Sequence, residues 1–96
     1  MNADARPGKL FVLGQLAATP GALALLEKAD LPGYDLLIRH VAGDFGELCA
    51  EDLAANERAI LEGTRILSAY VVAGERLWVI TEADRSVTTL LLPSEY

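Results

Sequence analysis

Hydrophobic and polar positions follow a period of two in the second half of the chain, as in β-strands whose side chains alternate between two faces. The three segments with this pattern are rich in branched and aromatic residues, and short stretches of small or polar residues separate them. The pattern predicts an antiparallel meander with strands at 65–72, 76–81 and 87–92 and turns at 73–74 and 83–86.

A two-residue hairpin turn at 73–74 sets the register of the first two strands. Tyr70 then pairs with Leu77, and Arg65 lies opposite Glu82, where the two charges are expected to form a cross-strand ion pair. The polar residues from 83 to 86 are then explained as the turn between the second and third strands, where such residues are common. The further pairs expected are Val72 with Glu75, Ile80 with Thr89, and Trp78 with Leu91.

In the first half of the chain, apolar residues recur at helical spacing and predict three helices, at 19–29, 34–43 and 47–63. Thr19 is a good N-cap for the first helix. Gly63 is a natural end for the third, as Gly43 is for the second. The apolar residues that mark these helices are Ala22, Leu23 and Leu26, then Leu37, Ile38 and Val41, then Leu53, Ile60 and Leu61.

The segment before the first helix has a less definite pattern. Residues 1–8 carry turn formers without periodicity and are expected to be a flexible tail. Residues 9–18 form either an edge strand or a buried helical turn, and Gly14 marks a bulge or a close approach between backbones.

These elements predict a single α+β domain over residues 1–96, with N-terminal helices packed on a C-terminal three- or four-stranded antiparallel β-meander. Both faces of that sheet are apolar, and three helices can cover only one of them. The second face needs the N-terminal segment or another protein chain. We therefore expect a homodimer or a complex with a protein partner.

The chain carries 14 acidic and 8 basic residues, a formal net charge of −6, which opposes direct binding to nucleic acids. Six of the acids lie between positions 44 and 62, with Arg58 as the only Lys or Arg there. These residues give the third helix an acidic outer face. That face either is simply solvated or binds a basic surface of a protein partner. The partner-binding candidates are Asp44, Glu47, Glu51, Asp52 and Glu62.

Cys49 is the only cysteine, which fits a reducing cytoplasm, and no apolar run is long enough for a membrane span. Cys49 is expected to be a small buried residue. The only histidine, His40, lies near Asp44, but Gly43 separates them and no cluster of further ligands is present. We expect no metal and no cofactor, and His40 to be a helix C-terminal residue favoured by the helix dipole.

Four segments resemble a family of short bacterial proteins from plasmids, phages and other mobile elements, usually labelled "plasmid-related protein". The segments are RHVAGDFGEL, EGTRILSAY, WVITEADRSVTT and LLPSEY, and Phe45 stands where the family usually has Trp. Some members carry a label as type I restriction subunits, but no restriction methyltransferase motif is visible in this sequence. The resemblance implies a mobile-element setting, where small acidic proteins often inhibit host CRISPR or restriction complexes.

The C-terminal half is also similar to the closing strands of barnase-type ribonucleases. That similarity implies Glu82 as general base, His40 as acid, and Arg65 and Arg85 as phosphate-binding residues. In that type the histidine lies in the late hairpin, whereas His40 lies on an upstream helix. We therefore favour a non-catalytic protein-binding accessory protein of a mobile element, with a barnase-like endoribonuclease as the alternative.

Overall fold

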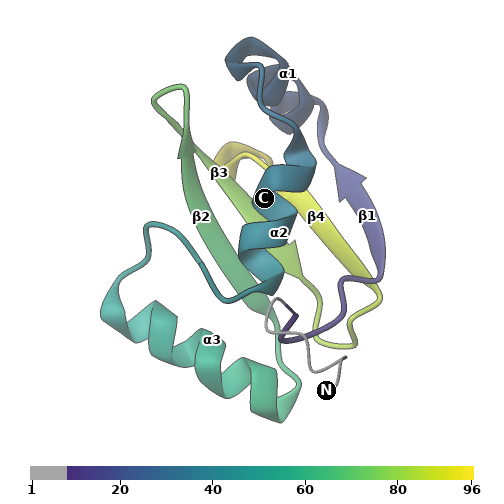
Figure 1. Cartoon of the computed structure of the whole chain (residues 1–96), viewed down its shortest axis with the longest axis vertical. Helices are drawn as coiled ribbons and strands as arrows, with labels where there is room; N and C mark the ends of the chain where they lie inside the picture. The colour runs from purple at the N-terminus through teal and green to yellow at the C-terminus, as the bar shows by residue number, and fades with distance from the viewer. Residues whose placement is uncertain (1–8) are drawn as a thin grey trace.

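The computed structural model describes residues 9–96, and the tail expected at residues 1–8 lies outside the described part. The chain is an α+β domain in which three N-terminal helices pack on a four-stranded, mostly antiparallel sheet (Figure 1). In chain order the elements are β1 (Gln15–Ala18), α1 (Pro20–Ala29), α2 (Gly33–Val41), α3 (Ala50–Glu62), β2 (Ile66–Val72), β3 (Glu75–Thr81), β4 (Val87–Leu91) and the 3₁₀ turn η1 (Pro93–Glu95).

The sheet has the order β1-β4-β3-β2, and its meander has the register expected from the hairpin turn. Tyr70 pairs with Leu77, and Trp78 pairs with Leu91. Of the two open alternatives for residues 9–18, the edge strand is present at residues 15–18 as β1, whereas residues 9–14 are neither strand nor helix. β1 runs parallel to β4 and makes the sheet mixed. Gly14 is a close approach as expected, because a Cβ there would overlap the carbonyl oxygens of Arg85 and Ser86.

Helices α1 and α2 cover one face of the sheet and form the main core with it (Figure 1). Two of the apolar residues that mark these helices in the sequence are exposed rather than in the core, Leu23 by 56% and Ile38 by 50%. Because α1 is apolar around most of its circumference, its sequence does not fix which side faces the sheet. The helical residues that are buried instead are Ala22, Leu25 and Leu26 in α1 and Leu36, Leu37, His40 and Val41 in α2.

The C-terminal turn, rather than the N-terminal segment, packs against the opposite face of the sheet. The rings of Tyr96 and Trp78 make an edge-to-face contact with centroids 5.8 Å apart. The Arg65 guanidinium lies 5.3 Å from the same tyrosine ring. The predicted ion pair between Arg65 and Glu82 is wrong: Arg65 faces an aromatic ring, and no ion pair joins it to Glu82.

Glu95 fastens this C-terminal turn to the start of α1. Its carboxylate accepts hydrogen bonds from the Gly21 N–H (2.9 Å), the Leu92 N–H (2.9 Å) and the Thr19 hydroxyl. Thr19 is also the N-cap predicted for α1, since its Oγ1 accepts from the Ala22 N–H. The Thr19 hydroxyl bond, followed by the backbone bonds, lowers the pKa of Glu95. An anion at this helix N-terminus is also favoured by the helix dipole.

The outer edge of β2 is covered by two separate contacts. The loop before α3 bridges to it at Gly46 and Ala69, with hydrogen bonds from the Ala69 N–H to Phe45 O and from the Glu47 N–H to Ala69 O. The Asn56 side chain then donates to Leu67 O (2.7 Å) and accepts from Leu67 N–H (3.1 Å). Phe45 itself is buried, so an aromatic side chain anchors this loop in the core.

Within residues 9–96, no helix combines the length and the apolar character that crossing a membrane requires.

Candidate functional site

The polar run between β3 and β4 forms the end of a hairpin that is attached to α3. The Asp84 carboxylate accepts from the Ser86 N–H (3.0 Å), and hydrogen bonds from Ser86 lower the pKa of Asp84. The Arg85 guanidinium donates to Thr64 O (2.7 Å) and Ala59 O (3.0 Å). The polar run from 83 to 86 therefore forms a turn, as predicted, and has a structural role in this conformation.

Arg85 supplies the positive charge that the end of α3 lacks. The last turn of α3 contains no basic residue, although cations there stabilise the exposed carbonyl groups of a helix. Arg85 reaches across from the hairpin to fill this role, and its backbone takes a left-handed φ of 61° to do so. Its charge is thus directed at backbone oxygens.

His40 lies in the middle of a buried chain of hydrogen bonds between α2 and the sheet. Its Nδ1 is 2.6 Å from the Ser68 hydroxyl, and its Nε2 is 2.9 Å from the Thr81 hydroxyl. Thr81 is 2.6 Å from the Thr88 hydroxyl, and Thr88 donates to Leu13 O (2.7 Å). This chain ties α2, three strands and the N-terminal segment together.

The direction of these bonds fixes the tautomer of His40. Thr88 must donate to the Leu13 carbonyl, because a carbonyl only accepts. Thr88 therefore accepts from Thr81, which leaves Thr81 to accept from the Nε2–H of His40. Nδ1 is then unprotonated and accepts from Ser68. All four side chains are satisfied with a neutral imidazole.

Burial lowers the pKa of His40 to about 4, so the ring is neutral near pH 7. His40 lies in the last turn of α2, as expected, but the expected role of a charged ring favoured by the helix dipole is wrong, because burial keeps the ring neutral. The residue is 0% exposed, and the rings of Phe11 and Phe45 make edge-to-face contacts with the imidazole. Spacing on the helix could not reveal this, because its partners lie on distant strands.

The structure does not bring the four residues of the ribonuclease hypothesis into one cleft. His40 is buried on the helix-covered face of the sheet, while Arg65 packs with Tyr96 at the opposite face. Glu82 and Arg85 are neighbours in the hairpin, where the Arg85 N–H donates to Glu82 O. Both ring nitrogens of His40 are engaged, so this conformation offers no acid to a substrate.

Among the acidic candidates, Asp44 is engaged in a local contact. Its carboxylate lies 2.7 Å from Arg39 Nε, and this hydrogen bond, followed by the weaker effect of the Gly46 N–H, lowers the pKa of Asp44. Its carbonyl accepts from the buried Tyr70 hydroxyl (2.6 Å). Burial raises the pKa of Tyr70 to about 12. Asp44 thus holds the loop before α3 in place.

The other acidic candidates, Glu47, Glu51, Asp52 and Glu62, are exposed on α3 and on the loop that precedes it. Only two of the thirteen residues of α3, Asn56 and Ala59, are buried. Of the apolar residues whose helical spacing predicts this helix, Ile60 is partly buried, whereas Leu53 is 36% exposed and Leu61 is 87% exposed. The helix is thus held by Asn56, Ala59, Ile60 and Arg85, and most of its circumference faces solvent.

Cys49, expected to be buried, is exposed at the N-cap position of α3, where the chain leaves the loop and enters the helix. Over the described residues 9–96, no three His, Cys, Asp or Glu side chains gather as metal ligands would.

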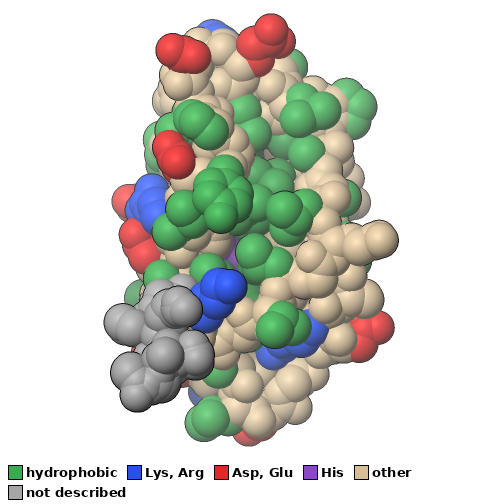
Figure 2. All heavy atoms as spheres, turned by 45° about the vertical axis from the view of Figure 1, so that its right-hand side comes forward, with side chains coloured by type: hydrophobic (Ala, Val, Ile, Leu, Met, Phe, Trp, Pro, Cys, Tyr) green, Lys and Arg blue, Asp and Glu red, His purple; other side chains and the backbone are tan. Residues whose placement is uncertain are grey.

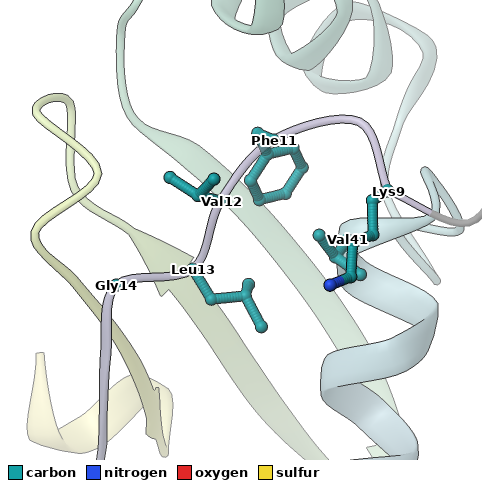
Figure 3. Close-up of a pocket in the computed structure, with 6 residues that line it drawn as sticks. All are labelled: Lys9, Phe11, Val12, Leu13, Gly14 and Val41. Atoms are coloured by element: carbon teal, nitrogen blue, oxygen red, sulfur yellow. The ribbon is translucent and has the colours of Figure 1, made fainter. Parts of the chain in front are cut away.

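Apolar side chains gather on the side of the molecule that carries β1, and acidic ones lie mostly around its margin (Figure 2). A cavity of about 200 Å³ opens between the N-terminal segment and α2. Figure 3 shows Phe11 and Leu13 pointing toward α2 and Val12 pointing away from it. The cavity is smaller than typical small-molecule sites, which begin at about 300 Å³. Its lining consists of Lys9, Phe11, Val12, Leu13, Gly14 and Val41.

A comparison with protein-family models found no match, and comparisons with curated proteins and with solved structures found none either. The geometry of the described residues is therefore the basis for the functional argument.

Proposed function

We propose that this chain is a non-catalytic, protein-binding module that presents the acidic side of α3 to a basic surface of a partner. The observation that carries the proposal is the small footprint of α3, which buries two of its thirteen residues. A helix that contributes so little to the core is nonetheless fixed at defined backbone positions by Asn56 and Arg85. This arrangement leaves its outer side free and keeps it rigid.

Rigid display matters because binding loses less entropy when the contact residues are already ordered. α3 carries four acids, Glu51, Asp52, Glu57 and Glu62, against one base, Arg58. Clustered carboxylates steer association with a positively charged patch and discriminate against acidic partners. Protein surfaces that normally hold DNA or RNA are basic patches of this kind. With the mobile-element setting that the resemblance implies, a nucleic-acid-binding surface of a host defence complex is the partner class that we propose.

The experiment compares three immobilised baits in a bacterial host lysate: the native chain, an α3 variant and a matched control. Each variant removes three negative charges by isosteric substitution, so the net charge changes equally. The α3 variant carries Glu51→Gln, Asp52→Asn and Glu62→Gln. The control carries Glu27→Gln, Asp30→Asn and Asp35→Asn, which are also exposed but lie on α1, at its C-cap and on α2.

A specific partner should be retained by the native chain and the control, and depleted at least about tenfold by the α3 variant. Raising salt from about 0.15 M to about 0.5 M should release it, because the contact is electrostatic. Equal retention by the two variants would contradict the role of α3. Thermal denaturation of all three baits checks that the substitutions leave the fold intact.

The ribonuclease alternative has its own assay. Incubation of the purified chain with RNA should give no cleavage, since His40 is buried and hydrogen-bonded on both nitrogens. Cleavage that is lost in both His40→Ala and Arg65→Ala variants, while Val71→Ala stays active, would overturn the preference for binding.

A further inference from the structure

The two edges of the sheet differ in how they are protected. The β2 edge is covered by the bridge at Gly46 and by the side chain of Asn56. The β1 edge has neither device. In its parallel ladder with β4, the N–H groups of Gln15 and Thr19 point inward, to Ser86 O (2.9 Å) and Leu90 O (3.0 Å). By alternation, the backbone N–H and C=O groups of Leu16 and Ala18 point outward.

An edge strand with free backbone groups is a template for pairing, and proteins usually block it with charge, proline or a bulge. The residues of β1, Gln15 to Ala18, include no charge and no proline. The uncharged stretch is much longer than the strand, because residues 10–26 contain no Asp, Glu, Lys, Arg or His. No charge in this segment, and no proline within β1 itself, opposes the approach of another strand.

The surface beside this edge is apolar. Leu16 is 54% exposed and Val12 67% exposed, and Figure 2 shows apolar side chains gathered over this side of the molecule. Six side chains of the segment and of α1 and α2 are between 47% and 67% exposed. Those residues are Leu10, Val12, Leu16, Leu23, Tyr34 and Ile38.

We propose that two copies of this chain pair their β1 strands antiparallel about a twofold axis, which joins two four-stranded sheets into one. With the axis at Ala17, Leu16 pairs with Ala18 of the partner subunit and the reverse, an isologous arrangement that uses all four outward groups of each strand. The charge distribution favours a second copy as the occupant. The chain carries a net charge of −6, yet the surfaces brought together are uncharged over residues 10–26.

A stable protein interface buries about 800 Å² on each partner, so exposed apolar side chains beside the paired strands are expected to join the contact. The proposal goes beyond the binding role of α3 and does not depend on it. α3 packs against β2, at the edge of the sheet farthest from β1 (Figure 1), so the dimer leaves both acidic helices exposed.

The test is sedimentation equilibrium of the native chain and two variants of matched chemistry. Leu16→Lys places a charge on the open edge at a residue that is 54% exposed. Val71→Lys makes a similar change at a residue that is 57% exposed on β2, the covered edge. The native chain and Val71→Lys should sediment as dimers of the 10.3 kDa chain. Leu16→Lys should raise the dimer dissociation constant by about 100-fold.

Hydrogen exchange adds a readout at the strand itself. The amides of Leu16 and Ala18 should become protected as protein concentration rises through the dimer transition, because they point away from β4. A native chain that remains a 10.3 kDa monomer at millimolar concentration would overturn the proposal. It would do so even if the monomer bound an extended segment of another protein at β1. A dimer that withstands Leu16→Lys, or that dissociates with Val71→Lys, would also overturn it.

Discussion

The buried hydrogen-bond chain around His40 predicts a specific loss of stability in mild acid. The folded state holds the ring neutral, with a pKa of about 4 against an ordinary value of 6.5. Between these two values the unfolded chain binds a proton that the folded chain excludes. Stability therefore rises with pH across this window and falls as the solution is acidified from pH 6.5 toward pH 4.

The size of the effect follows from the difference between the two pKa values. Integrating the proton linkage from pH 7.5 down to pH 4.5 gives a loss of about 2–3 kcal/mol from this residue. Such a loss is a large part of the stability of a small domain, which is about 5–15 kcal/mol. Protonation would also turn Nδ1 into a donor and remove the acceptor that Ser68 uses.

The assay compares urea unfolding of the native chain and His40→Gln at a series of pH values. Glutamine keeps a donor and an acceptor but does not titrate, so the carboxylates contribute equally to both profiles and cancel. The native chain should lose about 2–3 kcal/mol more than the variant over the same range. His40 is the only histidine, so its imidazole NMR signals report its pKa and its Nε2–H tautomer directly. Equal slopes, or titration near pH 6.5, would refute the reasoning.

Three further substitutions test the contacts that hold the loop and α3. Asn56→Ala should destabilise the fold by about 2–4 kcal/mol in urea unfolding, because it leaves both backbone groups of Leu67 without a partner. Arg85→Ala should speed hydrogen exchange in the last turn of α3 and cost about 1–2 kcal/mol, while Arg85→Gly should cost less than Arg85→Ala because the backbone there has a positive φ. Gly46→Ala should cost more than about 3 kcal/mol, because a Cβ would overlap Ala69 O at a positive φ, whereas Gly74→Ala, which meets no atom within 4 Å, should cost about 1 kcal/mol by thermal denaturation.

The meander could be predicted from the sequence because the residues that specify its turns and strand pairing lie close together in the chain. Ala73 and Gly74 both have positive φ, as a two-residue hairpin turn requires, and the alternation on either side sets the pairing. The N-cap Thr19 and the helix end at Gly63 are equally local signals. Each of these features depends on residues within a few positions of one another.

The contacts that escaped prediction depend on distant residues or on weak patterns. His40 bonds to Ser68 and Thr81, which lie 28 and 41 positions away, so no spacing rule identifies them. The docking of α3 uses Asn56 and Ala59, a polar and a small residue, and periodicity points instead to larger apolar ones. The one available sign in the sequence was a hydroxyl side chain on each of three neighbouring strands, Ser68, Thr81 and Thr88, which require a polar partner when buried.

The polar groups with perturbed pKa values are already engaged in hydrogen bonds within the fold. A catalytic group combines a perturbed pKa with access to a substrate. Here the two groups with the largest pKa shifts, His40 and Tyr70, are almost fully buried, and both are engaged in hydrogen bonds. The guanidinium of Arg85, which lies in the turn between β3 and β4, donates its hydrogen bonds to backbone carbonyls.

The contacts that cover the β2 edge also position α3, since Asn56 belongs to that helix and the Gly46 bridge lies in the loop that leads into it. Covering this edge and displaying the acidic helix are therefore a single structural arrangement. It removes one pairing edge from the sheet and concentrates negative charge beside it. The β1 edge lies at the opposite side of the sheet, within an uncharged segment. The two surfaces differ in chemistry and are separated by the width of the sheet, so one protein can be expected to use them for two different contacts at the same time.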